Sequence, residues 1–119
     1  MKMKLVFLYH PVKDLKESLA FYRDVLGWDE AWRMGDATVA MQIPGSDVQV
    51  MLDATEDASG LGASGFYEVD DVDRFYEANR DRMTFVEPPQ DLEPIRYASF
   101  TDPSGNPFRL FHEVEGAAQ

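Results

Sequence analysis

The sequence predicts an α+β fold in which two βαβββ modules form a curled mixed sheet around a shared pocket. Three observations predict it. A length of 119 residues suits one domain. Each half carries a strand, a helix and then two or three strands, a weak repeat of about 55 residues. A tight turn joins the last two strands. We place the modules at residues 1–57 and 58–119, within one compact domain. From pattern alone, a single open α+β sandwich is the alternative.

The first module is expected to begin with an apolar strand at Met3–Tyr9, covered on both faces. Asp14 caps the following helix, with Glu17 three residues later as in a capping box. Gly27 ends this helix. Three short strands follow, separated by turn residues: Trp28–Met34, Ala37–Ile43 and Val48–Leu52. The polar residues 53–63 are interpreted as a linker.

The second module repeats this order. Ser64–Val69 is expected to form its first strand, and Asp70 with Asp73 starts its helix. Thr84–Val86 is a short strand, which the pair Pro88-Pro89 is expected to break.

The chain closes with a predicted hairpin, whose sequence from residue 97 to residue 112 is YASFTDPSGNPFRLFH. Pro103 presets the backbone of the turn and Gly105 permits a positive φ. Asp102 can accept hydrogen bonds from backbone amides of the turn.

This hairpin and the segment from Asp14 to Gly27, DLKESLAFYRDVLG, resemble the vicinal oxygen chelate superfamily. That family is also called the glyoxalase, bleomycin-resistance and extradiol-dioxygenase family. The resemblance extends over roughly residues 3 to 114 and implies the fold described above. It is nearest to the metal-free bleomycin-resistance-like branch.

In metal-dependent members, the resemblance places metal ligands at three positions that hold Phe7, Ser64 and Arg109 here. Phe7 cannot bind a metal, Ser64 is a poor ligand, and Arg109 brings a positive charge where a carboxylate is needed. A further ligand position falls at Gln49, Val50 or Met51, and its register stays open. We therefore expect no metal, no cofactor and no catalytic residue.

The two histidines do not supply an alternative metal site. Strand alternation places His10 opposite Phe7 and Tyr9, and His112 opposite Arg109 and Phe111. The sequence also has no nucleophile elbow and no phosphate-binding glycine motif.

The remaining hypothesis is a binding cavity lined by side chains from both modules. Its expected ligand-binding residues are Phe7, Tyr9, Trp32, Gln49, Met51, Ser64, Arg109 and Phe111. Even spacing puts Trp28 and Trp32 on one strand face, although these rings can equally pack against the helices. Arg109 either holds an anionic or carbonyl-bearing ligand or neutralises a carboxylate such as Asp53 or Glu68.

Composition limits the partners. A formal charge of −11, from 22 acidic and 11 basic residues, argues against nucleic acid. The acidic surface indicates solubility, and a cation-attracting cavity is the alternative interpretation of the charge.

The sequence has no cysteine, and it has no apolar run as long as the about 18 residues of a membrane span. Residues 1–10 run directly into a strand and are not expected to act as a secretion signal. The expected location is the cytoplasm.

We therefore expect a metal-free small-molecule-binding protein that sequesters a drug or a metabolite. By resemblance, it forms a homodimer. Two other classes stay open. One is a metal-dependent lyase, isomerase or dioxygenase of the same superfamily with an atypical site. The other is an interaction module whose acidic surface meets a basic protein.

Overall fold

A computed structural model describes residues 2–56 and 60–114. The chain divides into two compact units, Val6–Ala63 and a second unit of Ser64–Gln119 with Met1–Leu5. We call them the first and the second module. The predicted boundary between residues 57 and 58 lies outside the described residues.

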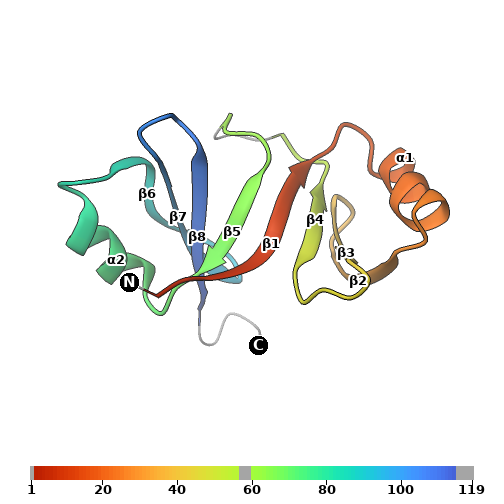
Figure 1. Ribbon diagram of the computed structural model, residues 1–119, viewed down its shortest axis with the longest axis horizontal. Coiled ribbons are helices and arrows are strands. Elements are labelled where there is room, and N and C mark those ends of the chain that lie inside the picture. The colour runs from red at the N-terminus through yellow and green to blue at the C-terminus, as the bar shows by residue number, and fades with distance from the viewer. Residues whose placement is uncertain (1, 57–59, 115–119) are drawn as a thin grey trace. The chain divides into compact units, whose positions relative to one another are not determined.

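The first module contains one helical segment and a four-stranded mixed sheet in the order β2-β3-β4-β1 (Figure 1). β1 pairs with β4 in parallel, and the other neighbours are antiparallel. Its elements are β1 (Lys4–Pro11, whose first two residues belong to the second unit), α1 (Leu15–Leu19), the π-helix η1 (Ala20–Val25), β2 (Asp29–Met34), β3 (Thr38–Gln42) and β4 (Gln49–Asp53).

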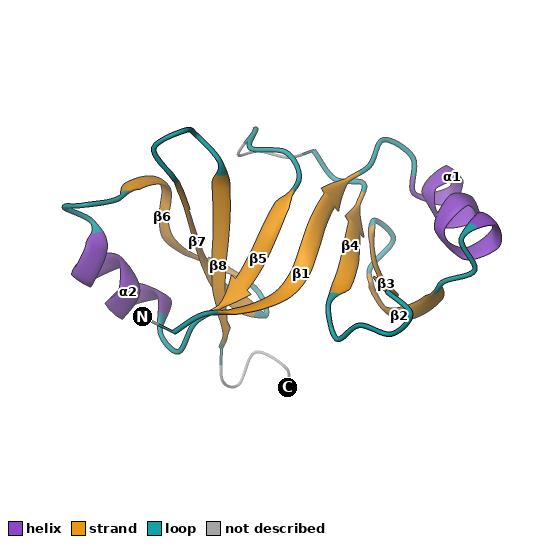
Figure 2. Cartoon of the chain, in the orientation of Figure 1, coloured by secondary structure: helices purple, strands orange, loops and turns teal. Residues whose placement is uncertain are grey.

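The second module repeats this arrangement with the strand order β5-β8-β7-β6 (Figure 2). β5 pairs with β8 in parallel, and the other neighbours are antiparallel. Its elements are β5 (Ser64–Glu68), α2 (Val72–Asn79), β6 (Thr84–Leu92), β7 (Ile95–Thr101) and β8 (Pro107–Glu113). The predicted α+β class with two βαβββ modules is confirmed. The shared pocket stays a prediction.

Local sequence signals explain where the helices and the last turn lie. The carboxylate of Asp14 accepts a hydrogen bond from the Glu17 amide, as a helix N-cap does. Gly27 follows the helical segment with φ 74°. In the second module the cap is Asp71 and not the expected Asp70, because the Asp71 carboxylate accepts from the Arg74 amide.

The hairpin turn forms as predicted. Asp102 Oδ1 accepts hydrogen bonds from the amides of Ser104 and Asn106, and Gly105 has φ 87°.

β6 is longer than expected. It continues through Pro88 and Pro89 to Leu92, so the prediction that this pair breaks the strand was wrong. The reason is position: β6 is the edge strand of its module's sheet order, where a missing amide hydrogen costs no ladder bond. A register shift between Glu87 and Gln90 accommodates the two prolines.

In each module, one face of the sheet packs against the helix. In the first module the core under the helix consists of Leu19, Val39, Met41, Val50 and Leu52. In the second it consists of Val69, Val72, Ala98, Phe100 and Leu110. Strand alternation sends the neighbouring side chains to the opposite face, which we call the helix-free face of each module.

Candidate functional site

The helix-free face of the first module carries the five predicted ligand-binding residues of that module. Phe7 pairs with Gln49, and Tyr9 pairs with Met51, in the β1–β4 ladder. The Trp32 ring meets Phe7 edge-on, with ring centroids 5.7 Å apart. The Trp32 indole N–H donates to Gln49 Oε1 at 3.0 Å. A hydrogen bond thus links the Phe7–Trp32 aromatic pair to the side-chain amide of Gln49.

Tyr9 extends this face with a second polar group. It is buried, and its hydroxyl donates to Asp53 Oδ2 at 2.7 Å. Asp53 Oδ1 accepts from the hydroxyls of Thr38 and Thr55 at 3.0 and 2.8 Å. Both carboxylate oxygens of Asp53 therefore have partners within the first module.

The helix-free face of the second module brings Ser64 and Arg109 together. Arg109 is only 2% exposed, and its guanidinium donates a hydrogen bond to Ser64 Oγ. Arg109 lies directly opposite Phe66 on β5 and Ser99 on β7, so the three side chains share a face. Phe111, the remaining predicted residue, contacts the Phe66 ring at 5.5 Å.

Three further residues on this face were not predicted from the sequence: Glu87, Tyr97 and Ser99. Glu87 Oε1 accepts hydrogen bonds from the Tyr97 hydroxyl and from Ser99 Oγ, the latter at 2.7 Å. Burial, and next the hydrogen bond to Glu87, raise the pKa of Tyr97 to about 12. The phenol therefore keeps its proton at neutral pH and acts as a donor. Glu87 lies opposite Ser99 because of the register shift between Glu87 and Gln90, which the sequence pattern does not reveal.

Trp28 and Trp32 do not share a face, so that prediction was wrong. Trp28 precedes β2 and packs with the core under the helix, where it lies 5.4 Å from the Tyr22 ring. Trp32 lies on the helix-free face. The register shift between Glu30 and Trp32 in the β2–β3 ladder removes the simple alternation that even spacing assumes.

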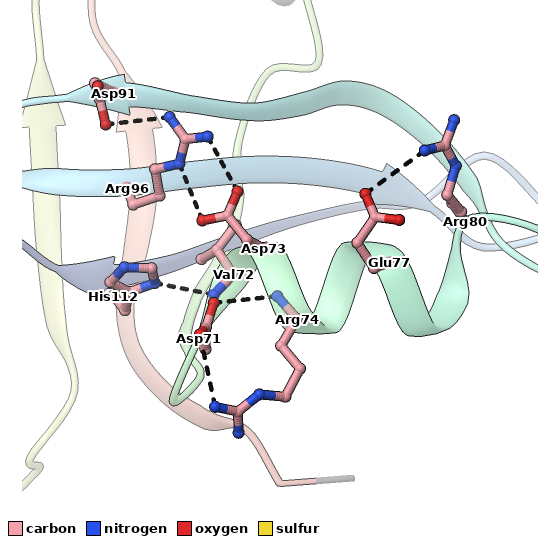
Figure 3. Close-up of polar contacts among 9 residues, drawn as sticks. All are labelled: Asp71, Val72, Asp73, Arg74, Glu77, Arg80, Asp91, Arg96 and His112. Atoms are coloured by element: carbon pink, nitrogen blue, oxygen red, sulfur yellow. Dashed lines mark hydrogen bonds and ion pairs between the residues drawn. The ribbon is translucent and has the colours of Figure 1, made fainter.

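Both histidines lie on the helix side of their sheets, as predicted. His10 Nδ1 is 3.2 Å from the Tyr22 hydroxyl, and burial lowers the pKa of His10. His112 Nδ1 accepts a hydrogen bond from the Val72 amide at 2.9 Å (Figure 3). His10 thereby links β1 to the helical segment of the first module, and His112 links β8 to α2.

A charged network supports α2 from the outside. Arg96 on β7 makes two hydrogen bonds to the Asp73 carboxylate and one to Asp91 (Figure 3). The hydrogen bond from Arg96 lowers the pKa of the Asp73 carboxyl. Both carboxylates are exposed and Arg96 is half-buried, so we assign these ion pairs to structural support of the helix and not to a site.

The residues at the positions where the family resemblance places metal ligands do not fit a metal. Phe7 offers no donor atom, and the Ser64 hydroxyl already accepts from the Arg109 guanidinium. A guanidinium repels a divalent cation. Within residues 2–56 and 60–114, no group of three His, Asp or Glu side chains is arranged to hold an ion.

A cleft of about 280 Å³ lies elsewhere, on the helix side of the first module. It is lined by Leu15, Lys16, Leu19, Arg23, Arg33 and Asp36, and by none of the predicted ligand-binding residues. Arg23 and Arg33 are ion-paired with Asp24 and Glu30. Its charged lining is exposed to solvent, unlike the desolvated polar groups of a preformed binding pocket.

No helix in the described part of the chain is both long enough and apolar enough to cross a membrane.

A family model described as the Glyoxalase/Bleomycin resistance protein/Dioxygenase superfamily matches residues 5–110. No curated protein matches the chain in sequence.

Several solved structures share the fold. A superfamily member from Vibrio splendidus is 22% identical with a TM-score of 0.65, over 92% of this chain and 98% of that chain. A methylmalonyl-CoA epimerase from Mycobacterium tuberculosis is 20% identical with a TM-score of 0.66, over 97% and 91%. A structure described as an NAD-dependent benzaldehyde dehydrogenase from Legionella pneumophila is 17% identical with a TM-score of 0.76, over 91% and 98%. At these identities the likeness concerns the fold alone.

Proposed function

The chain belongs to the glyoxalase/bleomycin resistance protein/dioxygenase superfamily, and from that premise we propose that it binds a small molecule without a metal ion. In this proposal the ligand is a drug or a metabolite that is sequestered unchanged, as in the bleomycin-resistance branch. The protein acts as a homodimer in the cytoplasm.

One observation carries the proposal: the guanidinium of Arg109 is buried and hydrogen-bonded to Ser64. By resemblance, these two positions hold a metal-binding carboxylate and a metal-binding histidine in the metal-dependent relatives. A permanently charged guanidinium supplies a fixed positive charge in place of the ion. Burying a charge costs folding free energy, so a buried charge is kept most readily where it has a function.

The chemistry of the second module's helix-free face favours a flat ligand with an acceptor group. Arg109 offers a planar donor fork that suits a carboxylate, a phosphate or a polarised carbonyl. Phe66 and Phe111 add aromatic rings to the same face, next to which a flat molecule can pack.

The proposal is tested by a thermal-shift screen of chelator-treated protein. Matched anionic, neutral and cationic aromatic compounds are screened against the wild type, Arg109→Met and the control Arg74→Met, which changes an exposed arginine on α2. We expect anionic or carbonyl compounds to raise the Tm of the wild type and of Arg74→Met with no metal added, and to lose this effect in Arg109→Met.

Two results would contradict the proposal. The first is stabilisation that appears only after a divalent metal is added, which favours a metal-dependent enzyme. The second is a set of binding compounds that Arg109→Met retains unchanged.

A further inference from the structure

We propose that Gln42 is a positioning residue for ligand binding: it fixes the direction of the Gln49 side-chain amide, which in turn holds the Trp32 ring in place for a flat ligand. The role of Trp32 as a ligand contact rests on the function proposed above. The hydrogen bonds that carry the inference all lie within the first module. Gln42 was not among the ligand-binding residues predicted from the sequence.

Gln42, Gln49 and Trp32 lie on neighbouring strands and on one face of the sheet. Gln42 on β3 pairs directly with Gln49 on β4, and Gln49 pairs with Phe7 on β1. Trp32 on β2 pairs with Ala40, two residues before Gln42 on β3. Paired residues and alternate residues of a strand share a face, so both glutamines lie on the face of the Phe7–Trp32 ring pair.

A chain of hydrogen bonds runs from a backbone turn to Trp32. Gln42 Nε2 donates to the carbonyl oxygens of Ser46 and Ile43 at 2.6 and 3.3 Å. Gln42 Oε1 accepts from Gln49 Nε2 at 3.2 Å. Gln49 Oε1 accepts from the indole N–H of Trp32 at 3.0 Å. Each amide therefore donates on one side and accepts on the other.

The groups at the two ends set the direction of this chain. Backbone carbonyls only accept hydrogen bonds, so they face the nitrogen of the Gln42 amide and turn its oxygen toward Gln49. An indole N–H only donates, so Trp32 requires the oxygen of the Gln49 amide. The Ile43 carbonyl also accepts from the Ser46 amide at 3.1 Å, which fixes the turn where the chain starts. Reversing either amide would set donor against donor.

The consequence for a ligand is a preorganised ring. Trp32 is half-buried, and it is held through its indole N–H and by the edge-on contact with Phe7, at an interplanar angle of 84°. A ligand that packs against a ring already ordered loses less side-chain entropy on binding. The alternative is that Gln42 only holds the turn of residues 43–46. The two roles are separable, because they use opposite ends of the same amide.

Two substitutions of Gln42 separate these roles. Gln42→Lys supplies only donors, so it still bonds to the turn carbonyls but faces the Gln49 amide with a donor and reverses it. Gln42→Glu supplies only acceptors at neutral pH, so it keeps the direction of Gln49 but loses the bonds to the turn. A role in the turn alone therefore favours Gln42→Lys over Gln42→Glu, and the proposed role favours the opposite order.

The first measurement is the order parameter of the Trp32 indole N–H from ¹⁵N relaxation, without any ligand. The chain has two tryptophans, so Trp28→Phe assigns the resonances. We expect about 0.85 in the wild type and in Gln42→Glu, and less than about 0.6 in Gln42→Lys. The double variant Gln42→Lys/Gln49→Glu should restore the rigid value, because a carboxylate accepts from both neighbours. The control Gln90→Lys, at an exposed residue of β6, should match the wild type.

The second measurement uses benzamide as the ligand, a flat neutral ring with a polarised carbonyl. Titration followed at the Trp32 indole resonance should show binding to the wild type and to Gln42→Glu. Binding should be weaker by about threefold or more in Gln42→Lys, because the ligand must then order the tryptophan side chain.

The inference is overturned if Gln42→Lys keeps the order parameter of the wild type, if Gln42→Glu lowers it as much as Gln42→Lys does, or if Gln42→Lys binds benzamide as tightly as the wild type. A wild-type Trp32 resonance that benzamide does not shift would also reject it. These outcomes leave metal-free binding at Arg109 to its own test, the thermal-shift screen.

Discussion

The guanidinium of Arg109 donates a hydrogen bond to the hydroxyl of Ser64, a residue 45 positions earlier in the chain. The parallel pairing of β5 with β8 produces this contact, because it places Arg109 opposite Phe66, two residues beyond Ser64 on the same face. Two positions that the family resemblance assigns to metal ligands are thus hydrogen-bonded to each other. One of them, Arg109, carries a positive charge.

Ser64→Ala is expected to destabilise the protein by about 1–3 kcal/mol, because it removes a hydrogen-bond acceptor from a buried charged donor. Urea unfolding at pH 7 measures this change. Ser104→Ala, in the exposed hairpin turn, serves as the control and should stay within about 0.5 kcal/mol of the wild type. Equal stability of the two variants would show that the Ser64 hydroxyl contributes little to holding Arg109.

Trp32 should report ligand binding and Trp28 should not, since only Trp32 lies on the helix-free face. In Trp28→Phe the remaining tryptophan fluorescence should be quenched by compounds found in the thermal-shift screen. In Trp32→Phe the quenching should disappear. Trp32→Ala should weaken binding by on the order of 1 kcal/mol through lost ring contact. Unchanged affinity in Trp32→Ala would assign the ring to packing.

Stability should fall as the pH drops through about 6.5, in part through His10. Burial lowers the pKa of His10, so between the folded and unfolded pKa values the unfolded chain binds more protons. The contribution is therefore present above the unfolded pKa and is lost on acidification. NMR titration of the imidazole resonances measures the folded pKa, and His10→Asn assigns the signal because the chain has only two histidines. A His10 midpoint at or above 6.5 contradicts this assignment of burial.

The protein should be a homodimer in solution, as the family resemblance implies. Light scattering of the wild type at tens of micromolar should give about twice the 13.5 kDa mass of one chain. A monomer over that concentration range would reject the dimer and any ligand groove formed between subunits.

Local signals in the sequence predicted most of the fold. Asp14, Gly27 and the Asp102 turn each satisfy particular backbone groups, so their positions could be inferred without tertiary structure. The helix side of His10 and His112 also followed from strand alternation.

The errors arose where strand pairing departs from regular geometry. Even spacing misplaced Trp28 relative to Trp32, because the ladder shifts register between Glu30 and Trp32. The two prolines hid the edge strand that carries Glu87. Its partners Tyr97 and Ser99 were therefore not recognised as a polar row, since only the β6–β7 register brings them to Glu87.

The metal content of the purified protein tests whether the chain binds small molecules without a metal ion. Protein expressed in medium supplemented with zinc, nickel, iron and manganese, then mildly dialysed, is analysed by elemental mass spectrometry. The account predicts far less than one metal ion per chain, because Phe7, Ser64 and Arg109 stand at the ligand positions that the resemblance implies. One tightly held ion per chain, retained in the wild type and lost on mutation of an acidic or histidine side chain, would contradict it.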